Sequence, residues 1–177
     1  MSAAPEEALQ RQLASESATQ ALGVALARSL PGDARDAVVV YLQGDLGSGK
    51  TTLARALLRE LGAQGTVRSP SYTLLESYEL TGLLALHLDL YRLRDASELE
   101  HLALRDQLRA NVLLLVEWPE RALGLLAAAD LCIELLVSTS EPTAAEGGAV
   151  ELRREARLSA ASATGQHWLA ALAGCSG

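Results

Sequence analysis

The chain has 177 residues, 49% of them hydrophobic, which is enough for one compact domain with a sizeable core and too few for two ordinary domains. Its net charge of −7, with Lys50 as the only lysine, argues against direct nucleic-acid binding, because contacts to phosphates need clustered Lys and Arg. Cys132 and Cys175 stand far apart, which argues against a zinc site or a disulfide framework. The absence of a signal-peptide pattern and of an apolar run of about 18 residues predicts a cytoplasmic protein without membrane spans.

The first half of the chain predicts alternating helices and strands. Residues 1–15 are expected to form a loosely ordered leader, and apolar residues at helical spacing predict a helix over 16–30 that ends at a Pro-Gly pair. The continuous β-branched run at 37–42 predicts a buried strand. A Gly-rich turn follows, and a leucine stripe then predicts a helix over 51–61.

The second half continues this alternation. A polar stretch over 66–78 is expected to form a loop that leads into a short strand. The remaining predicted elements are a strand over 83–90, a helix over 97–109, strands over 112–116, 131–137 and 150–159, and a short helix over 166–173. The pattern predicts an α/β sandwich in one domain over 1–177, with a largely parallel sheet and antiparallel strands near the C-terminus.

A phosphate-binding motif joins the first predicted strand to the helix after it. Residues 44–51 read Gly-Asp-Leu-Gly-Ser-Gly-Lys-Thr and fit G-x-x-x-x-G-K-[ST] in full, which chance gives on the order of once in a hundred chains of this length. Glycines let amide N–H groups turn toward anionic oxygens, Lys50 reaches the β- and γ-phosphates, and the Thr51 hydroxyl is placed to ligate Mg²⁺. The motif predicts a P-loop NTPase-like three-layer sandwich that binds Mg-ATP. The predicted nucleotide-binding residues of the loop are Gly44, Asp45, Leu46, Gly47, Ser48, Gly49, Lys50, Thr51 and Thr52.

Two acidic residues end predicted strands. Glu117 follows the apolar run at 112–116, and Asp89 follows the run at 83–88 in much the same arrangement. A P-loop enzyme needs a carboxylate at such a strand end to hold Mg²⁺ or its waters. Together with Lys50, both acids are candidate catalytic residues, and which of them touches the metal stays open.

For several other residues the sequence gives weaker indications of a role in the site. Thr73 and the segment 69–72 are placed where a hydroxyl senses a γ-phosphate, although an ordinary hydroxyl-rich turn has the same pattern. Trp118 is interpreted as an aromatic that caps the core, and His87 as a structural histidine. The scattered arginines are interpreted as surface residues: Arg92, Arg94 and Arg121.

Four segments in this order and spacing resemble the TsaE family, the bacterial P-loop ATPases needed to make threonylcarbamoyladenosine in tRNA. They are GDLGSGKTT at 44–52, SPSYTLLESY at 69–78, HLDLYRL at 87–93 and VEWPE at 116–120. The resemblance covers roughly 16–173. The P-loop alone occurs in many nucleotide-binding proteins, so it does not identify a family. The third and fourth segments make the resemblance specific to the TsaE family.

The resemblance implies a role for each motif. Lys50 and the loop amides would bind ATP, Thr51 and Glu117 would hold Mg²⁺, and Asp89 would assist hydrolysis. Thr73 would belong to a switch-like loop, and Trp118 would sit near the nucleotide or a partner. Glu16, at the start of the first helix, is the candidate for binding the base.

The resemblance also implies partners. Members of the family act with TsaB and TsaD, and ATP hydrolysis resets that complex, whereas TsaD transfers the threonylcarbamoyl group. Contact with tRNA would be indirect, through the complex. The chain departs from the family pattern at Ser71, Leu88 and Ala103; a glycine is expected in place of Ala103, so a turn is altered there.

Three other functions are compatible with a P-loop, and the sequence argues against two of them. A small-molecule kinase would need an acceptor pocket and an arginine-rich lid, and the sequence has no such arginine cluster. A GTPase would need an [NT]-K-x-D segment, which a chain with its only lysine in the P-loop lacks. An ATP-dependent adaptor that hydrolyses little remains an alternative.

Overall fold

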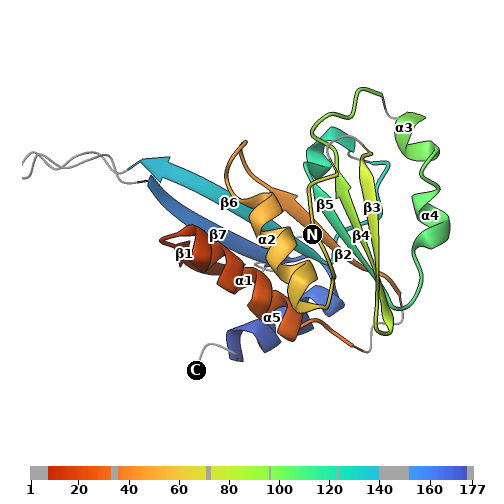
Figure 1. Cartoon of the computed structure of the whole chain (residues 1–177). Coiled ribbons are helices and arrows are strands. Elements are labelled where there is room, and N and C mark those ends of the chain that lie inside the picture. The colour runs from red at the N-terminus through yellow and green to blue at the C-terminus, as the bar shows by residue number, and fades with distance from the viewer. Residues whose placement is uncertain are drawn as a thin grey trace, which may run out of the picture.

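The computed structural model describes residues 8–32, 36–70, 73–95, 97–122, 124–139 and 152–174. They form one seven-stranded sheet in the order β1-β7-β6-β2-β5-β4-β3 (Figure 1). The strands are β1 (Ala8–Leu13), β2 (Val38–Gln43), β3 (Leu75–Leu80), β4 (Leu83–Asp89), β5 (Val112–Glu117), β6 (Leu131–Thr139) and β7 (Leu152–Ala160). The helices are α1 (Glu16–Arg28), α2 (Lys50–Glu60), α3 (Ser97–Glu100), α4 (Leu104–Gln107), the 3₁₀ helix η1 (Pro119–Ala122) and α5 (Ala163–Gly174).

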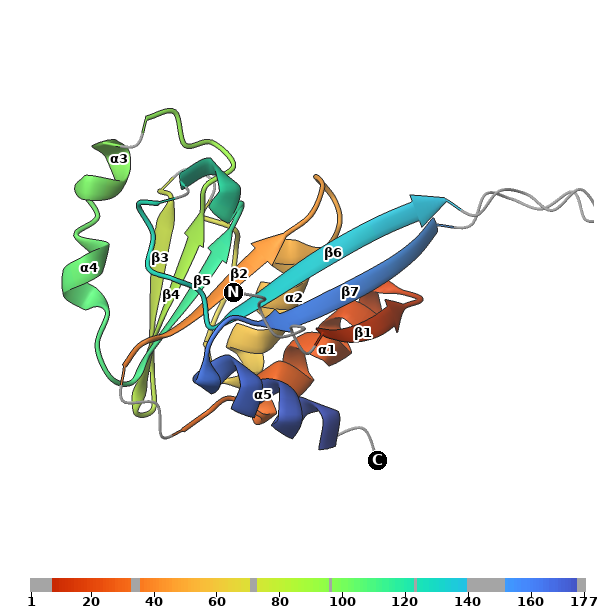
Figure 2. The ribbon, with the colours of Figure 1, turned by 180° about the vertical axis from the view of Figure 1, so that it is seen from behind.

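The strands in the middle of the sheet are parallel, and the outer strands on both sides pair antiparallel. β2 pairs in parallel with β5 and β6, and β5 pairs in parallel with β4. β6 and β7 form the predicted antiparallel pair near the C-terminus, which projects from the rest of the molecule (Figure 2). The α/β sandwich predicted from the sequence is confirmed.

The first strand corrects one expectation. Residues 8–13 were expected to belong to a loosely ordered leader, but they pair antiparallel with β7 as an edge strand. Their burial alternates, with Leu13 only 3% exposed, because one face of the strand packs on the core and the other meets solvent. Three consecutive polar residues at 10–12 concealed this pattern in the sequence. Residues 1–7 lie outside the described part of the chain.

Helices cover both faces of the sheet. On one face, α1 and α2 pack together and onto the sheet (Figure 1), with fully buried Leu26, Leu53 and Leu57 in a core that also takes Trp168 from α5. The other face carries a second core, where Leu88 and Leu114 meet residues of the α3–α4 segment and η1. No helix in the described ranges is long and apolar enough to cross a membrane.

The helix expected over 97–109 is wrong as a single element. It is broken into α3 and α4, each four residues long, because Ala103 adopts a left-handed conformation with φ +46° and ψ +38°. An L-residue in this region interrupts the hydrogen-bonding pattern of an α-helix. The break falls at the residue where the family resemblance suggested a glycine.

Three of the four parallel strands in the described sheet, β2, β4 and β5, have their carboxyl ends at the same edge of the sheet. β2 leads into the P-loop and α2, while β4 ends at Asp89 and β5 ends at Glu117. These two acids are register partners on neighbouring strands. The fold therefore brings residues from distant parts of the sequence to the edge where ligands of parallel sheets bind.

Candidate functional site

The P-loop has the backbone conformation that its glycines predict. Gly44 has φ +129°, and a Cβ there would lie 2.3 Å from the backbone oxygen of Leu135 on β6. Gly49 has φ +112° and caps α2 without a side-chain hydrogen bond to the helix. The first amides of α2 are therefore not satisfied by a capping side chain, which is the arrangement that favours an anion.

Lys50 is held against the loop. Its Nζ donates hydrogen bonds to the carbonyl oxygens of Gly44, at 2.6 Å, and Asp45, at 2.8 Å. The ammonium also lies 3.8 Å from the centroid of the Trp118 ring, and Lys50 is 4% exposed. Burial lowers the pKa of Lys50 below its ordinary 10.5, and this effect is partly offset by the carboxylates of Glu117, Glu120, Asp89 and Asp45.

Glu117 lies at the centre of a hydrogen-bonded chain of three side chains. The Thr51 hydroxyl lies 3.0 Å from Oε1 and 2.9 Å from Oε2 of Glu117, and donates to this carboxylate. On the opposite side, Nε2 of His87 lies 2.8 Å from Oε1. Glu117 is 2% exposed, so these hydrogen bonds provide the partners that a buried carboxylate requires.

Asp89 is the second carboxylate of the site. It accepts a hydrogen bond from the Ser69 hydroxyl, and its Oδ1 accepts one from the backbone N–H of Tyr91 at 3.0 Å. Asp89 is 5% exposed. The polar segment singled out in the sequence thus reaches the site through Ser69.

An open pocket of about 390 Å³ lies beside these residues. It is lined by Leu46, Gly47, Gly49, Lys50, Thr51, Thr52, Ser69, Asp89, Tyr91, Arg92, Glu117 and Trp118. Most of the predicted P-loop residues, both predicted acids and Trp118 therefore meet around one space. Arg92, interpreted from the sequence as a surface residue, is exposed and also lines it.

Five predicted site residues do not line this pocket: Gly44, Asp45 and Ser48 of the P-loop, and outside the loop Thr73 and Glu16. Thr73 is exposed. Glu16 is exposed at the first position of α1, where its Oε1 accepts a hydrogen bond from Gln20 at 3.3 Å. Their assigned roles stay predictions, and Ser71 and Tyr72 lie outside the described residues.

Sequence reasoning missed two residues of this region. Tyr91 packs its ring 5.1 Å from that of Trp118, and Arg121 stands 5.3 Å from the Tyr91 ring. Thr19, buried on α1, approaches Gly49 of the P-loop. The position of Tyr91 just beyond Asp89 was the available signal, whereas Thr19 lies in a part of the chain far from every motif.

The oxygen groups of the site fit a magnesium ion bound together with phosphates. The Thr51 hydroxyl and the Glu117 carboxylate are adjacent, and Asp89 lies on the neighbouring strand. In the described part of the chain, no group of three or more His, Cys, Asp or Glu side chains is arranged to hold a metal alone. The adjacent hydroxyl and carboxylate groups suit Mg²⁺, which uses one or two carboxylates and completes its coordination with phosphate oxygens and water.

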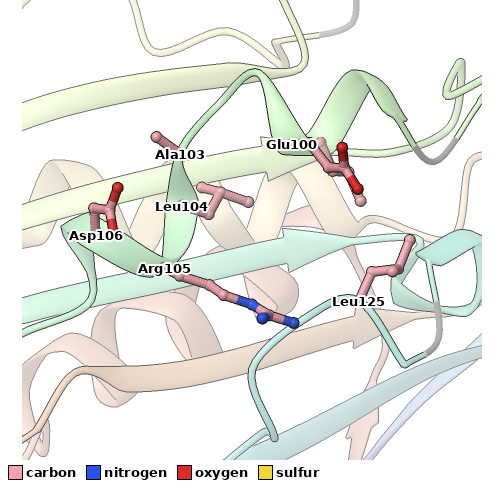
Figure 3. A pocket seen from close by; sticks show the side chains of 7 residues that line it. Glu100, Ala103, Leu104, Arg105, Asp106 and Leu125 are labelled. Atoms are coloured by element: carbon pink, nitrogen blue, oxygen red, sulfur yellow. The ribbon is translucent and has the colours of Figure 1, made fainter.

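A second pocket, of about 360 Å³, lies between the α3–α4 segment and the loop after η1. Arg105 extends from α4 toward the loop that carries Leu125 (Figure 3). The pocket is lined by Leu99, Glu100, Ala103, Leu104, Arg105, Asp106 and Leu125. It contains none of the predicted site residues, so the chemistry is assigned to the pocket beside the P-loop.

Comparison with known proteins places this site in a family. The family described as Threonylcarbamoyl adenosine biosynthesis protein TsaE matches residues 13–144. The chain is 48% identical over 99 residues to the tRNA threonylcarbamoyladenosine biosynthesis protein TsaE of Haemophilus influenzae, covering 56% of this chain and 63% of that protein. The protein of the same name from Bacillus subtilis is 39% identical over 88 residues, covering 50% and 51% of the two chains.

The fold has a solved counterpart. The crystal structure of YdiB from Bacillus subtilis superposes with a TM-score of 0.68 at 20% identity, covering 99% of this chain and 100% of that one. The sequence matches to the two relatives named above extend over about half to two thirds of the length of each relative. The family match covers both strand-end acids and the whole P-loop, and the chain therefore belongs to the TsaE family, named for threonylcarbamoyladenosine biosynthesis in tRNA.

Proposed function

We propose that the protein binds Mg-ATP in the pocket beside the P-loop and hydrolyses it in support of threonylcarbamoyladenosine formation in tRNA. One observation carries this proposal: the P-loop lysine, the Thr51 hydroxyl and the carboxylates of Glu117 and Asp89 line the same pocket. A triphosphate needs cationic and N–H groups, and its magnesium needs hard oxygen ligands. The residues of the pocket supply both.

Lys50 and the loop amides would bind the phosphates. The lysine ammonium would exchange the carbonyls of Gly44 and Asp45 for the β- and γ-phosphate oxygens, as P-loop lysines do. The N–H groups at the start of α2 would face the same oxygens. Because Trp118 lines the same pocket and keeps water from one side of it, these contacts would be stronger than in open water.

Thr51 and Glu117 would hold the magnesium ion, which supplies charge neutralisation of the β- and γ-phosphate oxygens when bound. Asp89, fixed by Ser69 and by the Tyr91 amide, would orient the attacking water. Each of the two oxygens of its carboxylate accepts one of these hydrogen bonds. This division of roles follows from the hydrogen bonds, since Glu117 contacts the hydroxyl that P-loop proteins use for the metal and Asp89 does not.

TsaB and TsaD are the proposed partners, and hydrolysis would reset their complex. Leu46 at the tip of the P-loop is 73% exposed, and Tyr91 at the pocket rim is 37% exposed. Large apolar side chains at the rim of a polar site are compatible with a protein partner that covers it. The net charge of −7 supports an indirect role toward tRNA.

The test is an ATPase assay with Mg-ATP on the protein alone and on its mixture with TsaB and TsaD. We expect weak turnover alone and stimulation by the partners, with no turnover in Lys50→Ala. Partner binding without turnover would instead establish an ATP-dependent adaptor. Transfer of phosphate to a small molecule would establish a kinase.

A further inference from the structure

His87 is a fully buried polar residue whose function the proposed chemistry does not explain. It lies on β4, two residues before Asp89, with 0% exposure. Its Nε2 lies 2.8 Å from Oε1 of Glu117, and its Nδ1 is buried without a hydrogen-bond partner in the described structure. A buried ring N–H needs an acceptor, and the acceptor that His87 has is the Glu117 carboxylate of the candidate site.

The contact with Glu117 determines the tautomer of His87. A carboxylate only accepts hydrogen bonds, so Nε2 carries the proton and donates it to Oε1. In this tautomer Nδ1 carries a bare lone pair. The opposite tautomer would bury an N–H donor without an acceptor and would place a lone pair against the carboxylate, which costs more than an unused acceptor.

The sheet register places His87 where it can orient Glu117. Asp89 is the register partner of Glu117, and His87 is the partner of Leu115, so His87 lies diagonally beneath Glu117 on the core side. The single hydroxyl proton of Thr51 faces both carboxylate oxygens, at 3.0 Å from Oε1 and 2.9 Å from Oε2, whereas His87 contacts only Oε1. The His87 contact therefore fixes the rotation of the carboxylate and leaves Oε2 as the oxygen with fewer hydrogen-bond contacts.

We propose that His87 is a positioning residue: its Nε2–H fixes the rotation of the Glu117 carboxylate, so that Oε2 and the Thr51 hydroxyl are presented together to the magnesium ion of a bound nucleotide. The inference rests on the proposed function. It assigns His87 an action through Glu117 and no contact with the nucleotide. Partners of this kind fix the orientation of metal-binding groups and raise their affinity.

The test compares His87→Gln with His87→Asn. The Gln side chain reaches far enough to place an amide N–H at the position of Nε2, whereas the shorter Asn side chain falls short of Glu117. Mn²⁺ replaces Mg²⁺ as the probe, and its affinity for the protein–ADP complex is measured by electron paramagnetic resonance. We expect a loss of about 10- to 100-fold in His87→Asn and of no more than about threefold in His87→Gln.

Binding of ADP in EDTA is the matched control, and we expect it to be the same in all three proteins. Unchanged Mn²⁺ affinity in His87→Asn, an equal loss in both variants, or an equal loss in EDTA would overturn the inference. Failure of the natural protein to bind Mn²⁺–ADP at all would overturn the proposed function together with it.

A measurement on the natural protein does not depend on the variants folding. The ¹⁵N chemical shifts of the His87 ring distinguish a protonated from a bare nitrogen. We expect a protonated Nε2 and a bare Nδ1. The opposite assignment would overturn the inference, because Nε2 could then not hold the Glu117 carboxylate.

Discussion

The ammonium group of Lys50 lies 3.8 Å from the centroid of the Trp118 indole ring while it donates hydrogen bonds to the carbonyls of Gly44 and Asp45. The backbone of Trp118 has an unusual left-handed conformation, with φ +59°. The backbone N–H of Trp118 donates a hydrogen bond to the carbonyl of Leu42 near the end of β2. The cation of the P-loop is therefore bound by the protein itself. Phosphate oxygens would compete with these contacts for it.

Trp118 fluorescence is predicted to report nucleotide binding. Movement of the ammonium from the ring toward a phosphate changes the electrostatic environment of the indole, so the emission changes as ADP is added. The chain has two tryptophans, and Trp168 is fully buried against α1, where its Nε1–H donates to the carbonyl of Leu26. We expect Trp168→Phe to retain the emission change and Trp118→Phe to lose it. The reverse result would show that binding acts on the core around α5.

Lys50→Ala is predicted to abolish nucleotide binding at ordinary concentrations. Removing one partner of a buried, hydrogen-bonded charge pair costs about 2–5 kcal/mol, which is roughly 30-fold to several thousand-fold in Kd. Isothermal titration calorimetry with ATP and Mg²⁺ measures the loss. Arg59→Ala on the exposed side of α2 is the control for a change of charge, and its affinity should match that of the natural protein. Equal binding by Lys50→Ala would contradict the assigned role.

The lowered pKa of Lys50 predicts a pH dependence of folding. Burial disfavours the ammonium, so the folded state releases its proton at a lower pH than the unfolded state, whose pKa is the ordinary 10.5. Between these two values the unfolded state binds more protons, and stability increases with pH. The natural protein should therefore gain stability relative to Lys50→Met as pH rises from the lowered pKa to 10.5. Parallel urea titrations of both proteins measure the difference, and a constant gap across this window would refute the prediction.

Glu117→Ala is predicted to lose Mg-dependent hydrolysis by roughly 10²-fold or more, while some ATP binding remains. The variant removes the acceptor of the hydrogen bonds from the Thr51 hydroxyl and from His87, so it also lowers the stability of the fold. The ATPase rate is therefore measured in the presence of the partners, and the Tm of the variant is measured in parallel. Glu117→Gln keeps the size and one acceptor oxygen but removes the charge. We expect it to lose activity to a similar degree with a smaller fall in Tm. Full activity in either variant would reject the role of this carboxylate.

The sequence predicted the centre of the site because each of its parts is locally encoded. Glycines specify the loop conformation, and the acids that follow the runs at 83–88 and 112–116 mark where strands end. Parallel pairing then brings Asp89 and Glu117 into register, a consequence of topology that the sequence only implies. The contacts that fix these groups were not predictable in the same way. The approach of Trp118 to Lys50 and the hydrogen bond from His87 depend on side-chain packing across three elements.

The margins of the fold were harder to predict for different physical reasons. β1 is a short edge strand with one solvated face, so its hydrophobic signal is weak beside that of the buried β2 and β5. The break between α3 and α4 depends on a single backbone conformation at Ala103, a residue with high helix propensity. Helical periodicity across 97–109 therefore predicted a continuous helix where the chain turns.

Ala103→Gly, between α3 and α4, is predicted to preserve or raise the free energy of unfolding, unlike glycine substitutions inside the helices. The left-handed conformation at Ala103 costs an L-residue about 1–2 kcal/mol, and glycine avoids this cost while losing roughly 0.5–1 kcal/mol through greater freedom in the unfolded chain. The free energy of unfolding should therefore rise by up to about 1.5 kcal/mol. Ala21→Gly, at an exposed position inside α1, is the matched control and should lower it by about 1 kcal/mol. An equal loss in both variants would mean that residue 103 is helical in solution and that α3 and α4 form one helix.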